Sequence, residues 1–290
     1  MDQKELDRTR YFELKKQLEE ASRLYYKDGV SPMSDQDFDF GLKEMEALEA
    51  KYPELRGKNS LTQKIGSDLT NDFAKVAHAV PMLSIANVYS EEEMREFVNA
   101  AEEGINSLDE SGSASTKGAS GDRAHTSHLK AHKWICERKI DGVSLSLVYE
   151  NGRLKQAATR GDGAQGDDVT NNALTIKDIP EYFDAKKLKI DPSEIPQGTF
   201  EVRGEVYMER EAFERLNEQF ILEGKKIFQN PRNTVSGSLK LKSVAECKTR
   251  PMRFFAYHIP PEHESRSEQT FRRFSLLFCA EHEKRKNYRG

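Results

Sequence analysis

The stretch ERKIDGVSLSLVYENGRLKQAATR, residues 137–160, decides the fold of the larger part of this chain. Apolar and small polar side chains alternate over residues 143–149, which is the period of a strand with one buried face. Asn151 and Gly152 supply the positive φ angles of a type I′ turn, and a return strand follows over residues 153–160. The stretch therefore predicts a β-hairpin.

The segments after this hairpin predict two more strands and a helix. Residues 200–208 and 254–257 have the composition of strands, and residues 210–223 predict a helix that Gly224 stops. A domain that mixes an antiparallel sheet with helices belongs to the α+β class. We expect this larger domain to span residues 67–290.

The N-terminal residues 1–66 predict a small helical domain. Its first helix, over residues 5–27, carries an apolar stripe at Leu14, Leu18, Ala21 and Tyr25. Ser34 and Asp37 have the spacing of a capping box that opens a second helix, which runs to Pro53. The stripe of this second helix comprises Phe38, Leu42, Met45 and Leu48 or Glu49. The two helices are expected to form an antiparallel hairpin.

A polar stretch interrupts the larger domain at about residues 107–128. It is rich in serine and glycine, and it contains too few apolar side chains to offset the entropy lost on ordering. We therefore expect a flexible surface insertion at this place.

The composition excludes several classes of protein. With 290 residues, 36% hydrophobic and 32% charged, the chain can bury at least one sizeable core. It has no apolar run of about eighteen residues and its N-terminus is charged, so we expect a cytoplasmic protein without a membrane span or secretory signal.

The net charge of -4 gives no general electrostatic footprint for nucleic acid. Cys136, Cys247 and Cys279 are too widely spaced to indicate a zinc site or a disulfide framework.

Lys139 and Asp141 are the candidate catalytic residues. A lysine is a poor nucleophile at neutral pH because its ordinary pKa is about 10.4. Lys139 lies two residues before Asp141, so on a strand both side chains would face the same way, and Gly142 would let the backbone turn or a phosphate approach. A divalent metal on that phosphate would favour the neutral amine and stabilise the transition state. The alternative is a surface pair of charges beside a turn glycine.

Four segments resemble known motifs in the same order. Glu137-x-Lys139-x-Asp141-Gly142 is similar to the first motif of the covalent nucleotidyltransferases, which include DNA ligases, RNA ligases and mRNA capping enzymes. Residues 159–172, 201–206 and 230–239 resemble segments of the NAD-dependent DNA ligases. The resemblance runs from about residue 10 to about residue 258, broken mainly by the polar insertion.

The resemblance implies that the chain adenylates itself. Lys139 would attack the adenylyl phosphorus of NAD, nicotinamide mononucleotide would leave, and a lysine–AMP phosphoramidate would remain. From their positions in the motifs, the resemblance implies that Glu137 contacts the adenine and Glu205 the ribose hydroxyls. It implies that other parts of the nucleotide are contacted by Arg160, Ser84 and Ile85. The chain has Ile85-Ala86 where the family usually has Leu-Asp. For Glu205, the alternative is a strand residue that faces water.

The N-terminal hairpin is expected to choose the cofactor. Asp35, Phe38 and Asp39 share one face of the second helix, with Tyr25 and Tyr26 as expected neighbours. An aromatic and anionic face suits the positively charged nicotinamide ring. The family pattern Asp-x-x-Tyr-Asp stands here as Asp35-Gln36-Asp37-Phe38-Asp39, so the tyrosine hydroxyl is lost and we expect weaker binding of the nicotinamide half. The alternative is an ordinary amphipathic hairpin with capping aspartates.

Family members continue through parts that we do not find in this sequence. These parts are two further lysine-bearing motifs, an OB-fold, a four-cysteine zinc module, helix-hairpin-helix repeats and usually a BRCT domain. The resemblance fades after Tyr257. We therefore expect a truncated chain, with a reading frame that shifts near residue 265.

Taken together, the resemblance implies a DNA ligase (NAD+) of DNA replication and repair, of which this chain covers self-adenylation only. The expected cofactors are NAD and magnesium or manganese, with no zinc site. Nicked duplex DNA is the expected partner of the full-length family, with weak or no DNA binding by this chain alone, and we expect a monomer. Two alternatives stay open: an inactive nucleotide-binding remnant, and an ATP- or GTP-dependent nucleotidyltransferase, against which the N-terminal hairpin argues.

Overall fold

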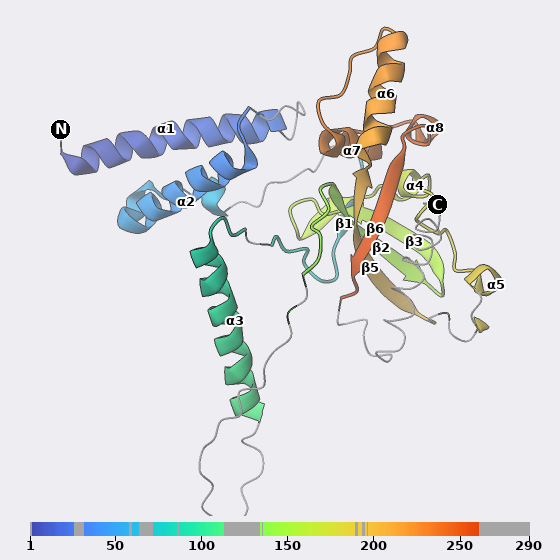
Figure 1. Ribbon diagram of the computed structural model, residues 1–290, viewed down its shortest axis with the longest axis horizontal. Coiled ribbons are helices and arrows are strands. Elements are labelled where there is room, and N and C mark those ends of the chain that lie inside the picture. The colour runs from blue at the N-terminus through green and yellow to red at the C-terminus, as the bar shows by residue number, and fades with distance from the viewer. Residues whose placement is uncertain are drawn as a thin grey trace, which may run out of the picture. The chain divides into compact units, whose positions relative to one another are not determined.

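Figure 1 shows the computed structural model of the chain, whose helices and antiparallel sheets confirm the predicted α+β class. The structure describes residues 2–25, 32–57, 60–63, 72–85, 87–112, 134, 136–188, 191–192, 195 and 197–260. The chain divides into two compact units, one of residues 1–83 and 140–290 and the other of residues 84–139. The predicted domain boundary at residue 66 stays a prediction.

The predicted helical hairpin is present at the N-terminus. It consists of α1 (Gln3–Arg23) and α2 (Asp35–Lys51). The helices run antiparallel, since Asp7 near the start of α1 pairs with Lys51 at the end of α2, with 2.7 Å between Oδ2 and Nζ. Their fully buried core comprises Tyr11, Leu14, Leu18 and Met45.

The start of α2 follows from a side-chain cap. The backbone N–H of Asp37 donates to the hydroxyl of Ser34 at 3.1 Å, which satisfies one of the free amide groups at the helix start. The Ser34 hydroxyl in turn donates to the Asp37 carboxylate at 2.6 Å. Ser34 is therefore the N-cap, as its spacing from Asp37 predicts. The predicted end of the first helix at residue 27 lies outside the described residues.

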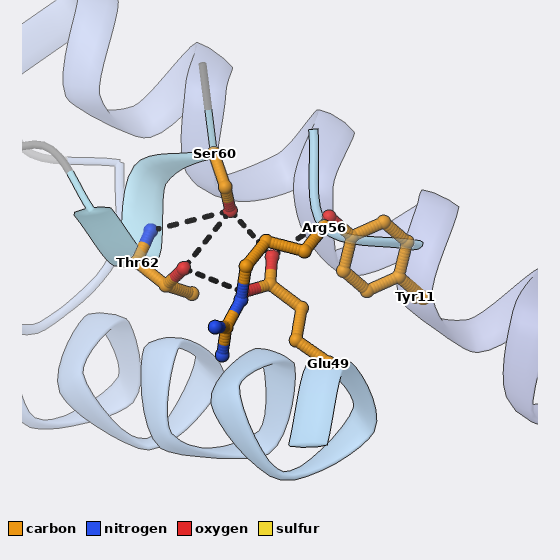
Figure 2. Close-up of polar contacts among 5 residues, drawn as sticks. All are labelled: Tyr11, Glu49, Arg56, Ser60 and Thr62. Carbon is orange, nitrogen blue, oxygen red and sulfur yellow. Dashed lines mark hydrogen bonds and ion pairs between the residues drawn. The ribbon is translucent and has the colours of Figure 1, made fainter. Parts of the chain in front are cut away.

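A buried carboxylate ties the end of the hairpin together. Glu49 in α2 is only 1% exposed, and Figure 2 shows polar side chains converging on it. Its carboxylate accepts hydrogen bonds from Ser60 at 2.5 Å, Thr62 at 2.7 Å, Tyr11 at 2.9 Å and Arg56 at 3.2 Å. Burial alone would raise the pKa of Glu49, but these hydrogen bonds together lower it. The network joins α1 and α2 to Arg56, which directly follows the 3-10 helix Pro53–Leu55, and to the 3-10 helix Leu61–Gln63.

Glu49→Gln should destabilise the hairpin by about 2 kcal/mol near neutral pH, because the charge-assisted hydrogen bonds are lost. The folded pKa of Glu49 is lowered, so its contribution is present above the unfolded value of about 4.5 and is lost as the pH falls through the folded value. The difference in unfolding free energy between the native chain and the variant should therefore shrink in acid, measured by urea unfolding with circular dichroism.

Glu44→Gln is the matched control, because Glu44 lies on the same helix, is exposed and pairs with Arg10 at 2.7 Å. Exposed pairs contribute less than about 1 kcal/mol, so this variant should change little. A difference between the native chain and Glu49→Gln that stays the same from neutral to acid pH would contradict the assigned role of the carboxylate.

A four-stranded antiparallel sheet forms the centre of the larger part of the chain. Its strand order is β3-β2-β5-β6, with each neighbouring pair antiparallel. The strands are β2 (Val143–Glu150), β3 (Arg153–Thr159), β5 (Thr199–Met208) and β6 (Met252–His258). All four coincide with predicted strands to within a few residues.

The turn between β2 and β3 has the predicted backbone. Asn151 and Gly152 have φ angles of 50° and 78°, the left-handed values that a type I′ turn needs at both positions. The N–H of Asn151 donates to the carbonyl of Gly198 at 2.9 Å, which ties the turn to the start of β5. Asn151, one of the two residues that predict the turn, therefore also anchors it to the next strand.

One face of the sheet packs against the domain core. The side chains on it are Leu145, Leu147, Tyr149, Phe200, Val202, Val206, Met208, Met252 and Phe254, all buried. The residues of helices α4 (Thr170–Ala173), α6 (Arg210–Leu222), α7 (Pro231–Leu239) and α8 (Val244–Cys247) complete this core. Each large apolar side chain buried in this way contributes roughly 1.5–3 kcal/mol.

A second, two-stranded sheet pairs β1 (Lys75–Ala77) with β4 (Gln165–Asp167). The fully buried carboxylate of Asp167 forms ion pairs with Lys75 on β1 and with Lys240 at the end of α7, the latter at 3.1 Å. This sheet was not predicted, because three-residue strands are too short to show a period. A further short helix is α5 (Ala185–Leu188).

The unit of residues 84–139 contains the helix α3 (Glu91–Gly112), which was not predicted. Its N-terminus is capped by Ser90, whose hydroxyl accepts from the N–H of Glu93 at 3.0 Å. The helix corrects the predicted insertion, because residues 107–112 are helical. Apolar residues recur at helical spacing along α3, and this pattern continues into the start of the polar stretch. The rest of the stretch, up to residue 128, lies outside the described residues.

The described residues contain no helix that is both long and apolar enough to span a bilayer. The predicted change of reading frame near residue 265 falls in residues 261–290, outside the described part of the chain.

Candidate active site

The face of the sheet opposite the core is polar and carries most of the candidate site. Five side chains lie on this polar face: Ser144 and Ser146 on β2, and Glu201, Arg203 and Glu205 on β5. The strand register places Ser144 opposite Glu205 and Ser146 opposite Arg203. Because side chains opposite each other in antiparallel strands are close, the polar residues form a continuous group.

Glu205 is held in place on this face. It is only 9% exposed, and the hydroxyl of Ser144 donates to its Oε2 atom at 2.9 Å. A buried carboxylate needs such partners, since leaving it unsatisfied would be costly. The alternative of a strand residue that faces water is therefore wrong. Its predicted contact with the ribose hydroxyls stays a prediction.

Asp141 and Arg232 meet beside Glu205. Arg232 lies in the first turn of α7, and its Nη1 donates to Oδ1 of Asp141 at 2.8 Å. Burial alone would lower the pKa of Arg232, but the nearby Tyr25, Asp141 and Glu205 outweigh it and raise the pKa. One guanidinium thus interacts with two carboxylates, with Asp141 through a hydrogen bond and with Glu205 through its charge. We call Asp141, Glu205, Arg232 and Ser144 the Arg232 cluster.

The prediction that Lys139 and Asp141 face the same way on a strand is wrong. Residues 136–141 have no regular secondary structure, and β2 begins only at Val143. The argument from alternating side chains therefore does not apply to this pair. The Asp141 side chain is 76% exposed despite its bond to Arg232.

Gly142 has a steric role that was not predicted, while the predicted approach of a phosphate stays a prediction. A Cβ atom at this position would lie 2.0 Å from the backbone carbonyl oxygen of Val206 on β5. The glycine is therefore required by the close approach of two strands, where the chain enters β2. Its backbone φ is not among the positive values in the described residues, so a left-handed turn is not the reason.

Gly142→Ala should destabilise the fold by about 1–3 kcal/mol, because the added methyl group forces β2 and β5 apart. Gly237→Ala is the control, since that glycine lies in α7 with no atom within 4 Å of the added Cβ. It should be neutral or slightly stabilising, as alanine favours helix. Urea unfolding measures both variants, and an unchanged midpoint for Gly142→Ala would refute the steric explanation.

Lys139, Glu137, Ser84 and Ile85 belong to the other unit of the chain, residues 84–139. All four are exposed. Their predicted roles toward a nucleotide stay predictions. In the sequence, Ile140 alone separates Lys139 from Asp141, a member of the Arg232 cluster.

Arg160 begins a tight loop between β3 and β4. The ring Nε2 of His78 lies 3.1 Å from the carbonyl oxygen of Thr159 and 3.2 Å from that of Arg160. Within the loop, the carboxylate of Asp162 accepts from the backbone N–H of Gln165 at 2.9 Å. This bond is the largest cause of the lowered pKa of Asp162. The loop that carries Arg160 is therefore closed by local hydrogen bonds.

The predicted nicotinamide face is described in part. Gln36 and Asp37 are exposed, Phe38 and Asp39 are half-buried, and the Asp35 side chain and Tyr26 lie outside what the structure describes. Phe38 packs against the apolar core of the hairpin, so part of its ring serves stability. Tyr25 is half-buried, and the Arg232 guanidinium lies 5.9 Å from its ring centroid.

Two residues near the cluster were not among the predicted site residues. Arg232 lies in the motif of residues 230–239, but its position in the sequence does not show that it pairs with Asp141. Tyr257, at the end of β6, lies close to Glu205. Partial burial is the largest cause of the raised pKa of Tyr257, and the negative charge of Glu205 also raises it. Among the described residues, no three or more His, Cys, Asp and Glu side chains gather in the manner of a metal site.

Comparisons with known proteins agree with these motifs. The family model described as the NAD-dependent DNA ligase adenylation domain matches residues 102–281, which extends past residue 258, where we expected the resemblance to end. The model described as the DNA ligase-like, N-terminal NAD+-binding domain matches residues 4–66.

Several curated relatives of the chain are named DNA ligase. A DNA ligase of Xanthobacter autotrophicus is 44% identical over 80% of this chain and 29% of its own length. A DNA ligase of Rhodopseudomonas palustris is 40% identical over 84% of this chain and 30% of its own length. One of Cytophaga hutchinsonii is 38% identical over 85% of this chain and 32% of its own length. The chain thus spans about a third or less of these relatives.

Proposed function

The chain belongs to the NAD-dependent DNA ligase family, and we propose that it performs the first step of ligation, the transfer of AMP from NAD to its own Lys139. The observation that carries the proposal is the Arg232 cluster: the guanidinium bonds to Asp141, two residues after the candidate nucleophile, and it also interacts with the charge of Glu205, which Ser144 holds. An inactive remnant under no functional constraint would not need to keep these groups together.

The chemical step exchanges one bond to phosphorus for another. The neutral Nζ of Lys139 attacks the adenylyl phosphorus, a P–N bond forms, and the P–O bond to nicotinamide mononucleotide breaks. The leaving group departs with the bonding electrons, and the amine loses its proton. Positive groups near the phosphate stabilise the charge that builds up during this transfer. Arg232 is the cation of the cluster that suits this purpose, because a planar guanidinium matches phosphate oxygens.

The polar face of the sheet suits the adenosine half of NAD. Glu205 accepts from Ser144 through Oε2. A carboxylate can accept two hydrogen bonds from neighbouring ribose hydroxyls. The expected contacts of Glu137 with the adenine, and of Arg160, Ser84 and Ile85 with other parts of the nucleotide, are carried over from the resemblance.

The helical hairpin suits the nicotinamide half. The ring of nicotinamide carries a positive charge, which aromatic faces and carboxylates attract. Phe38 and Tyr25 are the half-buried aromatic residues available for stacking. Asp35, Gln36, Asp37 and Asp39 on the first turn of α2 would supply carboxylate and amide groups.

Magnesium fits this proposal as a partner of the substrate. It is usually held by one or two carboxylates together with substrate phosphates, and the exposed carboxylate of Asp141 meets that requirement. When bound, it would neutralise phosphate charge. As the function that this step serves, we propose the sealing of nicks in duplex DNA during replication and repair, by a monomer in the cytoplasm.

The choice of donor tests the proposal against its alternatives. The chain is incubated with magnesium and with NAD, ATP or GTP labelled in the nucleoside monophosphate moiety, and the label that remains on the denatured protein is counted. We expect labelling with NAD alone. Labelling by ATP or GTP in preference to NAD would favour a different nucleotidyltransferase, and no labelling by any donor would favour the inactive remnant.

A further inference from the structure

A buried arginine on the polar face holds the segment that leads to Ser84 and Ile85. The Nη1 atom of Arg203 donates to the backbone carbonyl oxygen of Pro81 at 3.0 Å, and its Nη2 donates to that of Val80. The Arg203 side chain is 8% exposed. One guanidinium thus fixes two successive carbonyl groups, which sets both the position and the direction of the backbone there.

Arg203 is itself fixed by a buried carboxylate. Its Nε donates to Oε1 of Glu201 at 2.7 Å, and the hydroxyl of Ser146 donates to the same oxygen at 2.7 Å. Burying an ion pair costs desolvation energy, so such a pair is a poor way to gain stability. A pair of apolar side chains would hold the sheet together at least as well. The geometry that Arg203 imposes on the bound segment is therefore the better explanation for its presence.

The same segment is anchored on its other side by the loop that follows β3. The N–H of His78 donates to the carbonyl of Ala164, and the N–H of Met82 donates to the carbonyl of Gly163, both at 2.9 Å. The ring of His78 contacts the carbonyl of Arg160. Residues 78–82 are thus held between β5, which carries Glu205, and the loop that carries Arg160.

We propose that Arg203 is a positioning residue for the adenine nucleotide. It does not touch the nucleotide. It holds the backbone of Val80 and Pro81 against β5, the strand that carries Glu205, and Ser84 and Ile85 follow this held segment in the sequence. This inference rests on the proposed function, because Glu205, Ser84 and Ile85 matter here only as nucleotide contacts.

The test compares Arg203→Met with Arg250→Met in the full chain. Arg250 is the matched control, because its side chain is also 8% exposed and pairs with a carboxylate, Glu246, but it packs against Phe220 and Phe228 in the helical layer. Two quantities are measured: hydrogen exchange of the amides in residues 78–83, and the NAD concentration that gives half-maximal self-adenylation with magnesium.

In Arg203→Met, we expect the amides of His78 and Met82 to exchange at least about tenfold faster, because their segment loses an anchor. The half-saturating NAD concentration should rise at least about tenfold, since small misplacements of binding groups are costly. Arg250→Met should leave both unchanged. A purely structural loss would lower the yield of adduct through unfolded protein, without changing the half-saturating concentration.

The double variant Glu201→Leu with Arg203→Met removes both buried charges, so it guards against misfolding caused by an unpaired Glu201. It should show the same two changes. Unchanged exchange in residues 78–83, or faster exchange with an unchanged NAD requirement, would overturn the positioning role. A native chain that forms no adduct would overturn the proposed function instead, and the exchange result would still decide whether Arg203 holds the segment.

Discussion

Lys139→Ala should abolish the transfer of AMP from NAD to the protein. The ε-amino group is the atom that would bond to phosphorus, and no other group on that side chain can replace it. Loss of a nucleophile lowers the rate of an enzyme on the order of 10⁶-fold, which places the variant below detection. The measurement is the amount of covalent AMP formed with NAD and magnesium, followed over time in parallel with the native chain.

Lys155→Ala is the matched control for this experiment. Lys155 is an exposed lysine on β3 that pairs with Glu150 at 3.1 Å, away from the Arg232 cluster. Its loss should leave adenylation within about twofold, because exposed ion pairs contribute little. Covalent AMP that persists in Lys139→Ala and maps to another lysine would refute the assignment of the nucleophile.

Deletion of residues 1–66 should remove the use of NAD while leaving AMP binding nearly intact. The hairpin core of Tyr11, Leu14, Leu18 and Met45 is separate from the core under the sheet, so most of the sheet's packing survives the deletion. Without the hairpin, the nicotinamide half has no partner to orient the leaving group. We expect the adenylation rate with NAD to fall at least about 100-fold, and AMP affinity by calorimetry to change little.

Point variants separate the nicotinamide face from the fold of the hairpin. Asp35→Ala and Asp39→Ala should weaken NAD binding more than AMP binding. Asp7→Ala is the control, since Asp7 is a hairpin carboxylate that pairs with Lys51 at the other end of α2. Equal loss of NAD and AMP binding in the deletion, or unchanged reaction with NAD, would show that the hairpin does not select the cofactor.

Local backbone rules predicted the central sheet well. Asn151 and Gly152 take the left-handed angles that a type I′ turn requires, and the alternation of residues 143–149 gives the observed core and polar faces. The same rules could have found α3, because Ser90 caps it and apolar residues follow at helical spacing. The short strands β1 and β4 could not be found in this way, since their pairing depends on contacts between distant parts of the chain.

Contacts between residues far apart in the sequence explain what the sequence left open, both in the hairpin and in the candidate site. Helical spacing could not choose between Leu48 and Glu49 for the core stripe, and hydrogen bonds from one residue of α1 and three residues after α2 allow Glu49 to be buried. The motif indicated that Asp141 and Gly142 belong to the candidate site. It could not show that Arg232 bonds to Asp141 or that the Val206 carbonyl requires Gly142.

Intact-mass measurement after incubation with NAD and magnesium detects the adduct on the protein itself. We expect the native chain to gain the mass of one AMP group, excess nicotinamide mononucleotide to reverse the gain, and peptide mapping to place the group on Lys139. A chain that keeps its original mass at saturating NAD, while circular dichroism shows it to be folded, would contradict the claim that these residues form a self-adenylating site.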